Sequence, residues 1–501
     1  MKKKIILITI AIIFLGGYFI LSNSVGKYNS LRSFKQLFPQ EIKNFSKKYI
    51  FFVNYQNSLE NDLKTLKEDL KNNHTRQEFL ISVKEKAIIN LIENYGYMNI
   101  KKKSDIKKFQ ISKKKLTLEK FETSAILVPK YLGKGTAYIE YNNNKLILAS
   151  ANGMFFYVDI DKFSKDSFKA KVIKSNIREK IKYDRFYIKN KNDSYGIKDL
   201  FILNNKIYIS YNKQKDDTNS NQWRVNCYNT AIMVADLNYE NLKFNEFFTQ
   251  KNCIKNNKQL KYKDERYKDF LAAQSGGRIV KYKENKILFS IGEYRAYNVA
   301  QEKDNFFGKI ISLDIDGKNP EIISMGHRNP QGLFYDEKND VIFSTEHGPD
   351  GGDEVNHNIN PGGDKIENYG WPISSYGDHK YDVYDHQLSK LFPLHKSHSK
   401  YGFVEPLKYF YPSIGISEII KLENNSEDGG FNNLLVGSMG SLIEEGDLSL
   451  HYIKTDNNFK VIEHEVLKIN ERVRDMKYIP NLNKIFLFFD TSASIGVLTI
   501  K

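Results

Sequence analysis

The sequence predicts an all-β protein whose main body is a six-bladed β-propeller, preceded by an N-terminal transmembrane anchor and a helical stalk. Aromatic residues make up 13% of the 501 residues, with 32 Tyr and 33 Phe, a composition that suits strands. From about residue 122, one phrase recurs six times: a short strand, a polar turn rich in Asn, Asp and Lys, and a stronger apolar strand. The copies are Ala137–Ser150, Ile197–Ser210, Arg278–Ser290, Gly332–Ser344, Glu418–Ser438 and Asp475–Phe488.

The size of the repeating unit indicates propeller blades. Each unit occupies roughly 60 residues, the length of one four-stranded blade. Further strand candidates at Ala231–Asp236, Gly308–Asp316 and Ser449–Lys454 complete the sheets. Two separate β-sandwiches are the competing architecture, but sandwiches do not repeat one hairpin phrase in this way. We therefore expect residues 122–501 to form the propeller.

The N-terminus has the pattern of an export signal. Three lysines follow Met1 and precede an uncharged apolar run from Ile5 to Leu21. This run is just long enough to span a bilayer, so we expect residues 1–26 to remain as an anchor, with a cleaved signal as the alternative. The lysines then stay inside, which places the rest of the chain on the periplasmic side of the inner (cytoplasmic) membrane.

Residues 27–121 are expected to form a helical, membrane-proximal region. Leu59, Leu63, Leu66 and Leu70 recur at the spacing of one apolar helix face. A second helix is predicted over Gln77–Ile92. The pattern carries no catalytic motif, and it is typical of a stalk that lifts the main domain off the membrane.

The charge distribution argues against a nucleic-acid partner. The formal net charge is +16, but residues 1–120 hold 24 basic against 10 acidic residues, and the remainder holds 52 against 50. The basic excess therefore lies beside the apolar N-terminal run, where an anionic membrane surface is the simpler partner. The two cysteines, Cys227 and Cys253, either pair in an oxidising compartment or remain unpaired in neighbouring strands.

Two segments that interrupt the hairpin pattern carry candidate anion-binding groups. In propellers, such loops gather at the mouth of the central channel. In Gly326–Gly332, Arg328 offers a planar guanidinium for a carboxylate, and Asn329 both donates and accepts. In the other segment, regular alternation places Arg472 and Arg474 on one strand face, a clamp for a ligand with several carboxylates. Solvated arginines and a plain turn are the alternatives.

A third segment has the composition of a calcium loop. Glu346–Glu354 combines acidic residues with glycines that let carbonyl groups point inward, and Asn368–Pro372 adds a second glycine-containing turn. Closely spaced oxygen ligands suit Ca²⁺, although the spacing is not that of an EF-hand. On composition alone, a solvated acidic loop is an equally valid interpretation.

In this order and on six predicted blades, these segments resemble the soluble glucose and aldose sugar dehydrogenase family that uses pyrroloquinoline quinone. The resemblance is strong from about Gln274 to Asp475, rests only on the blade pattern over residues 122–270, and is absent from residues 1–120. It also includes Gly308–Ile310, Pro412–Ile414 and Gly437–Ser438.

The resemblance implies a set of ligand contacts. The carbonyl groups of Gly348 and Pro349 would face a cofactor-bound calcium, whereas Asp353, Glu354 and Tyr369 would hold a second, structural calcium. The quinone, which carries three carboxylates, would contact Arg328, Asn329, Arg472 and Arg474.

Two departures from the family pattern concern catalysis. The family places a general base, a histidine, four residues before the arginine of its His-x-Gly-Gly-Arg signature, and here Gln274 stands at that position before Arg278. An amide cannot take the proton of a hydroxyl group. A quinone-contacting lysine is also replaced, by Gly440. A substitute base could come from the insert between Tyr376 and Gly402, whose histidines are His379, His386, His395 and His398.

The expected function is oxidation of an aldose sugar at its anomeric carbon, by hydride transfer to pyrroloquinoline quinone with Ca²⁺, and with an external electron acceptor. The alternative is a non-catalytic, envelope-anchored propeller that binds a sugar or a protein and has lost its base. A scaffold that uses only the propeller rim is a third interpretation, but it gives Arg472 and Arg474 no reason to lie together.

Overall fold

The computed structural model describes residues 89–90, 92–112, 114–124, 135–181, 196–215, 227–255, 274–378, 392–423 and 431–501. These residues form strands and turns with only short helical segments, such as α6 (Ile177–Lys180), so the all-β prediction is confirmed. In this part of the chain, we find no helix with the length and apolar character needed to cross a membrane. The predicted anchor at residues 1–26 lies outside the described residues, as does the leucine pattern of the predicted stalk.

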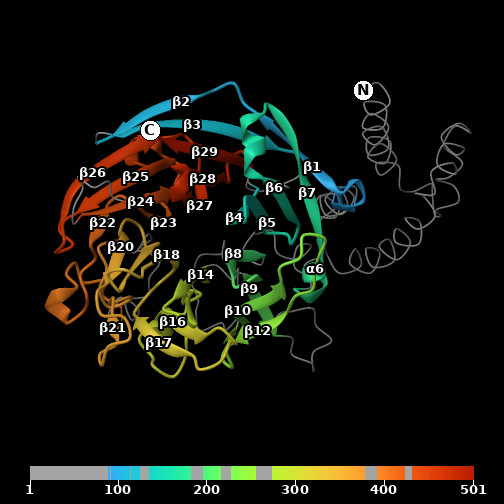
Figure 1. The fold of residues 1–501 in the computed structure, drawn as a ribbon. Coiled ribbons are helices and arrows are strands. Elements are labelled where there is room, and N and C mark those ends of the chain that lie inside the picture. The colour runs from blue at the N-terminus through green and yellow to red at the C-terminus, as the bar shows by residue number, and fades with distance from the viewer. Residues whose placement is uncertain are drawn as a thin grey trace, which may run out of the picture. The chain divides into compact units, whose positions relative to one another are not determined.

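Six antiparallel, four-stranded blades form the body (Figure 1). Their innermost strands contact one another in a closed ring, which is the arrangement of a propeller. From the innermost strand outward, the first blade consists of β4 (Ala137–Asn142), β5 (Lys145–Ser150), β6 (Phe155–Asp159) and β7 (Ser167–Ser175). The second blade consists of β8 (Ile197–Leu203), β9 (Lys206–Lys215), β10 (Cys227–Asp236) and β12 (Asn245–Thr249). The third blade consists of β14 (Gly276–Tyr282), β15 (Lys286–Ile291), β16 (Lys309–Asp314) and β17 (Glu321–Met325).

The remaining three blades follow the same order. The fourth blade consists of β18 (Pro330–Asp336), β19 (Val341–Glu346), β20 (Asp353–Asn358) and β22 (Lys408–Phe410). The fifth blade consists of β23 (Ile416–Leu422), β24 (Asn432–Ser438), β25 (Ser449–Thr455) and β26 (Val461–Lys468). The sixth blade consists of β27 (Val473–Ile479), β28 (Lys484–Phe489), β29 (Ser494–Ile500) and β3 (Lys114–Thr123). Short strands β11 (Asn241–Leu242), β13 (Ile254–Lys255) and β21 (Glu367–Asn368) add to β7, β10 and β17.

All six predicted hairpins coincide with the two innermost strands of a blade. Asparagines explain the tightest turns: Asn143 and Asn144 have φ of 47° and 61°, and Asn204 and Asn205 have φ of 49° and 58°. Two consecutive residues with positive φ make the hairpin turn whose twist matches that of paired strands, and Asn tolerates this conformation. The three additional predicted strands are confirmed: Ala231–Asp236 lies within β10, Ser449–Lys454 lies within β25, and Gly308–Asp316 contains β16.

The ring is closed by a strand that precedes the predicted boundary of the propeller. Strand β3 pairs with β29 and completes the last blade, while β1 (Tyr97–Lys102) joins β3 to β7 of the first blade, and β2 (Lys107–Ile111) pairs with β3. Strands β1, β2 and β3 therefore occupy most of the described residues from 97 to 121, where a helical region was predicted, and the boundary at residue 122 falls too late. The physical reason is burial: Leu116, Leu118 and Phe121 lie opposite Ile500, Leu498 and Ile495.

Apolar cores lie between neighbouring blades. The core between the first two blades contains Phe155 and Phe244, whose ring centroids are 5.3 Å apart. Equivalent cores lie between the second and third, third and fourth, fourth and fifth, and fifth and sixth blades, and the last of these includes β3. Cys253, in the second blade, is disulfide-bonded, whereas the side chain of Cys227 lies outside the described residues. The blades thus form a rigid ring on which the connecting loops are held.

Candidate functional site

The predicted site residues lie on connections at one end of the blades. In an antiparallel blade, the loop between the second and third strands and the connection into the next blade share one end. Gln274, Arg328 and Arg472 precede the innermost strands β14, β18 and β27, and the segment from His347 to Gly352 connects β19 to β20. The topology therefore gathers segments that are far apart in the sequence.

Gln274 and Arg328 are in direct contact. The amide of Gln274 is oriented by its neighbours, a donor on one side and a carboxylate on the other. Its oxygen accepts a hydrogen bond from Arg328 Nη2 at 2.6 Å, and its nitrogen donates to Glu293. Arg328 Nη1 donates to the carbonyl oxygens of His347 at 2.7 Å and Gly348 at 2.5 Å. Arg328 also lies over the Trp371 ring, 5.2 Å from its centroid. Both polar ends of the amide are thus engaged.

Glu293 completes this cluster from the connection between β15 and β16. Its backbone N–H donates to the Arg328 carbonyl oxygen at 2.9 Å, and the N–H of Tyr294 donates to that of Gln274 at 3.1 Å. The Glu293 side chain is fully buried, and among the described residues its Oε2 has no hydrogen-bond partner. Burial raises the pKa of Glu293 to about 8, against the opposing charge of Arg328. The sequence pattern does not single out Glu293, because its burial depends on the connection that folds over it.

Asn329 fixes the backbone rather than facing outward. Its Oδ1 accepts from the Gly276 N–H at 3.2 Å and from Gln331 Nε2 at 2.8 Å, so it joins the connections that lead into β14 and β18. Its carbonyl oxygen accepts from the N–H of His347 at 3.1 Å. Asn329 therefore holds the Arg328 and His347 segments together.

The Asp353 carboxylate holds the predicted calcium loop. Its Oδ1 accepts from His347 Nδ1 at 2.8 Å and from the Gly348 N–H at 3.0 Å, and its Oδ2 accepts from the Ile416 N–H at 2.8 Å. Burial alone would raise the pKa of Asp353, but His347 and these two N–H groups outweigh burial and hold the pKa below its usual range. The Pro349 carbonyl oxygen accepts from Ser413 Oγ at 3.2 Å. The loop is thus fastened to the next blade.

Glu354 and Tyr369 face other partners. Successive residues of a strand point to opposite faces, and Glu354 Oε1 lies 3.2 Å from His398 Nε2. Burial raises the pKa of Glu354, opposed by His398. The Tyr369 hydroxyl donates to the His357 carbonyl oxygen at 2.7 Å. The structure therefore does not bring the Asp353 and Glu354 carboxylates together, and within the described ranges no group of three or more His, Cys, Asp or Glu side chains is placed to hold a metal.

The two arginines of the last blade have different partners. Arg474 Nε and Nη2 donate to Asp490 Oδ2 at 2.9 and 2.6 Å, whereas Arg472 Nη1 donates to the Gly440 carbonyl oxygen at 3.3 Å. The register shifts between Val473 and Asp475, so the regular alternation assumed from the sequence does not hold at this point.

The glycine at position 440 is dictated by its surroundings. A Cβ atom there would lie 2.0 Å from the buried Asp447 carboxylate, which accepts from the N–H groups of Ser441 and Leu442. The loop between β24 and β25 is wound around this carboxylate, so no larger side chain fits at position 440 unless the loop moves. The lysine that the family resemblance leads us to expect at position 440 would therefore not fit in this loop.

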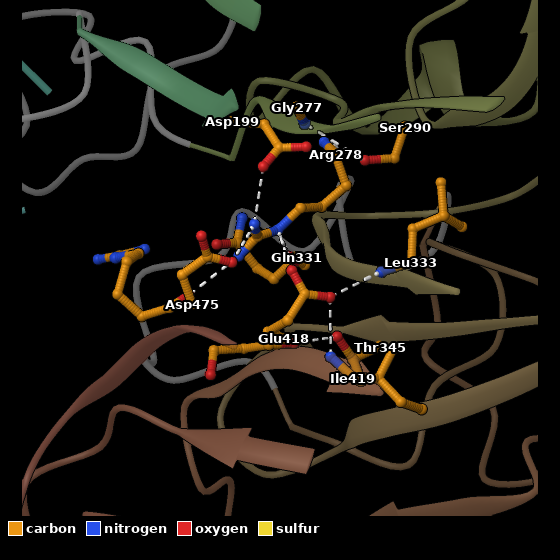
Figure 2. A network of polar contacts seen from close by, with 12 residues as sticks. Asp199, Gly277, Arg278, Ser290, Gln331, Leu333, Thr345, Glu418, Ile419 and Asp475 are labelled. Carbon is orange, nitrogen blue, oxygen red and sulfur yellow. Dashed lines mark hydrogen bonds and ion pairs between the residues drawn. The ribbon is translucent and has the colours of Figure 1, made fainter. Parts of the chain in front are cut away.

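Figure 2 shows Arg278 amid acidic side chains from other blades. Its Nη1 donates to Asp199 Oδ1 at 2.9 Å and to Asp475 Oδ1 at 2.7 Å, and its Nε lies 2.7 Å from Glu418 Oε2. Its Nη2 donates to the Arg474 carbonyl oxygen at 2.9 Å. Burial raises the pKa of Asp199 to about 7 and of Glu418 to about 8, opposed by Arg278.

This charged cluster joins the blades and was not anticipated from the sequence. Each of its four residues stands near the start of an innermost strand, beside a register shift. The signal that could have revealed the cluster is a charged residue at the same position of several of the repeated hairpins. Because Arg278 follows Gln274 by four residues, the cluster also anchors the strand that carries Gln274.

The histidine-rich insert does not supply a base to the Gln274 cluster in the described part of the chain. The His395 ring stacks on Tyr401 with centroids 3.7 Å apart, and His398 is buried against Glu354. His379 and His386 lie outside the described residues.

The fold and the gathered loops define a six-bladed propeller with an arginine-containing site at one end. Residues 196–497 match the family described as Glucose / Sorbosone dehydrogenase. The chain belongs to the glucose/sorbosone dehydrogenase family, as its motifs predicted.

Curated relatives and solved structures agree with this assignment. The chain is 34% identical over 115 residues to the aldose sugar dehydrogenase YliI of Escherichia coli, covering 20% of this chain and 30% of the relative. It is 26% identical over 295 residues to quinoprotein glucose dehydrogenase B of Acinetobacter calcoaceticus, covering 44% and 59%. Both alignments span less than two thirds of the relative's length.

The solved structures share the fold. The soluble aldose sugar dehydrogenase of Escherichia coli in its apo-form superimposes with a TM-score of 0.53 at 19% identity, covering 73% of this chain and 95% of that chain. A glucose dehydrogenase crystal structure gives a TM-score of 0.54 at 20% identity, covering 72% and 95%. The propeller architecture is thereby confirmed.

Proposed function

We propose that this chain is a quinoprotein-type oxidoreductase that oxidises an aldose at its anomeric carbon and passes the electrons to an external acceptor. Membership of the family supports this class of activity. The observation that carries the proposal is the convergence of Gln274, Arg328 and the Gly348 loop, the positions where the family resemblance places base, quinone contact and calcium ligand.

The residues at the site fit an anionic cofactor. Arg328 is partly buried, and among the described residues its Nε has no hydrogen-bond partner, so it can still donate to a carboxylate. Arg472 and Arg474 add positive charge on the last blade, although Asp490 balances Arg474. Pyrroloquinoline quinone, when bound, would supply a two-electron acceptor, and the arginines would orient its carboxylates.

Calcium at the quinone would be held by the carbonyl groups of Gly348 and Pro349, the part of the proposal that rests on the resemblance. The Asp353 carboxylate accepts from the Gly348 N–H in this loop and from the Ile416 N–H in the next blade, and these two hydrogen bonds give the loop the rigidity that a metal site needs. The proposed second calcium fits less well, because the Asp353 and Glu354 side chains point to opposite faces of β20.

The alternative is a propeller that binds a sugar or a protein without catalysis, and Gln274 favours it. An amide held between Glu293 and Arg328 cannot accept the hydroxyl proton. Under either function, we further propose that residues 1–26 tether the chain on the periplasmic side of the membrane and that 27 to about 96 act as a stalk.

The test is reconstitution. The chain from residue 27 onward is loaded with Ca²⁺ and pyrroloquinoline quinone, cofactor binding is measured by equilibrium dialysis, and dye reduction is followed with a panel of aldoses. Binding with turnover supports the oxidoreductase, binding without turnover supports the alternative, and no binding refutes both the cofactor and the activity.

A further inference from the structure

A buried carboxyl group lies beside the position where the family's base is missing. Glu293 is fully buried, one of its oxygens faces the Gln274 amide, and among the described residues the other has no partner. A buried polar atom without a hydrogen bond is unfavourable for the folded state, and a catalytic role is one reason for such an atom to persist. The arrangement thus calls for a functional explanation.

The charged groups around Glu293 come from several connections. Arg328, which precedes β18, favours the ionised form through its charge, and Arg295, two residues after Glu293, does so through its backbone N–H and its charge. Glu346 at the end of β19 opposes ionisation. Burial outweighs the arginines, so the carboxyl titrates above neutrality rather than in acid. A general base works best when its pKa lies near the operating pH, and Glu293 meets this condition.

We propose that Glu293, and not residue 274, accepts the proton of the anomeric hydroxyl group. The inference rests on the proposed function. The O–H bond of the sugar would break with its proton going to the Glu293 carboxylate, and the anomeric C–H bond would break with its hydride going to the two-electron acceptor that bound quinone supplies, so that a C=O bond forms and gives the lactone. Glu293 would then release the proton to solvent. The reduced cofactor would take one proton from solvent to balance the hydride, and the external acceptor would remove its two electrons.

Gln274 acts as a positioning residue that covers Glu293 until ligand is bound. Its amide oxygen takes the Arg328 Nη2 donor at 2.6 Å. A charged carboxylate is a stronger acceptor than an amide, so Arg328 would exchange Gln274 for a carboxylate of the ligand. The released amide can then turn aside and expose Glu293. The backbone bonds from Glu293 to Arg328 and from Tyr294 to Gln274 keep the three residues together during this exchange.

The experiment compares the wild type with Glu293→Gln, Gln274→His and the double variant, each loaded with Ca²⁺ and pyrroloquinoline quinone. Glu337→Gln, a change of an exposed glutamate on the neighbouring blade, is the matched control. Loss of a general base lowers kcat by about 10²–10⁴-fold, so Glu293→Gln should fall by at least about 100-fold with cofactor affinity unchanged. The double variant should recover activity, because imidazole at position 274 supplies an independent base.

A second readout does not depend on activity. A carboxyl whose folded pKa is raised destabilises the fold progressively as pH rises from its unfolded toward its folded pKa. The Tm of Glu293→Gln should therefore exceed that of the wild type at about pH 9 and approach it below about pH 4, where the glutamate is mostly neutral in both the folded and the unfolded chain. The difference in Tm between Glu337→Gln and the wild type should not show this dependence on pH.

The possible outcomes separate the two proposals. If the wild type turns over and Glu293→Gln retains kcat, Glu293 is not the base although the proposed function stands. If the wild type binds cofactor without turnover while Gln274→His turns over, the activity has lapsed and both proposals fail. A Glu293→Gln variant whose Tm follows that of the wild type at every pH overturns the assigned ionisation of Glu293. Loss of kcat in Glu293→Gln together with recovery of kcat in the double variant supports Glu293 as the base.

Discussion

Replacing Arg278 with Met tests how the charged cluster at the centre of the propeller holds the blades together. Arg278 is the cation that contacts three carboxylates, those of Asp199, Glu418 and Asp475, and all four side chains are at most 8% exposed. Removing one partner of a buried ion pair costs about 3–5 kcal/mol, because it leaves an uncompensated charge. With three carboxylates left, we expect the free energy of unfolding to fall by at least about 4 kcal/mol near pH 8.

The pH dependence gives this prediction its sign. Asp199 and Glu418 have pKa values raised to about 7 and about 8, so protonation neutralises both as pH falls. The loss caused by Arg278→Met should therefore be largest above about pH 8 and smaller at about pH 5. Urea unfolding at both pH values measures it.

The control lies on the same strand. Lys281 pairs with Glu337 at 2.9 Å, but these side chains are 43% and 61% exposed, so Lys281→Met should cost at most about 1 kcal/mol. An Arg278→Met variant as stable as Lys281→Met, or equally destabilised at both pH values, would refute the assigned role of the cluster.

Three further predictions follow from the fold and the site. Gly440→Lys should destabilise the chain by roughly 1–3 kcal/mol rather than restore a cofactor contact, because its Cβ would overlap Asp447; unchanged thermal unfolding would contradict this. A chain beginning at residue 125 lacks β1–β3, so the exposed edge of β29 should make it aggregate in size-exclusion chromatography, whereas a chain from residue 27 should elute as a compact species. Asp353→Asn should cost about 1–3 kcal/mol near pH 7, and the loss should shrink as pH falls, because a carboxylate with a lowered pKa stabilises only while ionised; a pH-independent loss in urea unfolding would exclude this explanation.

The blades could be predicted because their information is local. Alternating strands and asparagine turns, such as Asn143–Asn144, identify each inner hairpin from adjacent residues. The closing strand β3 could not be predicted in this way, because its partner β29 lies at the other end of the chain. The N-terminal leucine pattern extended the helical prediction over it.

The site was predicted in part, for similar reasons. Motif residues Gln274 and Arg328 are indeed in contact, although they are separated in the sequence. The assumed alternation of Arg472 and Arg474 failed at a register shift, which no local pattern announces. Glu293 could not be found, because its significance depends on burial against Gln274 and on an oxygen without a partner among the described residues.

The most direct test of the account is aldose-dependent dye reduction by the wild-type chain loaded with Ca²⁺ and pyrroloquinoline quinone, measured across pH. We expect turnover that rises with pH, is half-maximal near the pKa of Glu293, about 8, and levels off above it. A loaded wild-type chain that binds the quinone but reduces no dye with any aldose, while Gln274→His does, would contradict it.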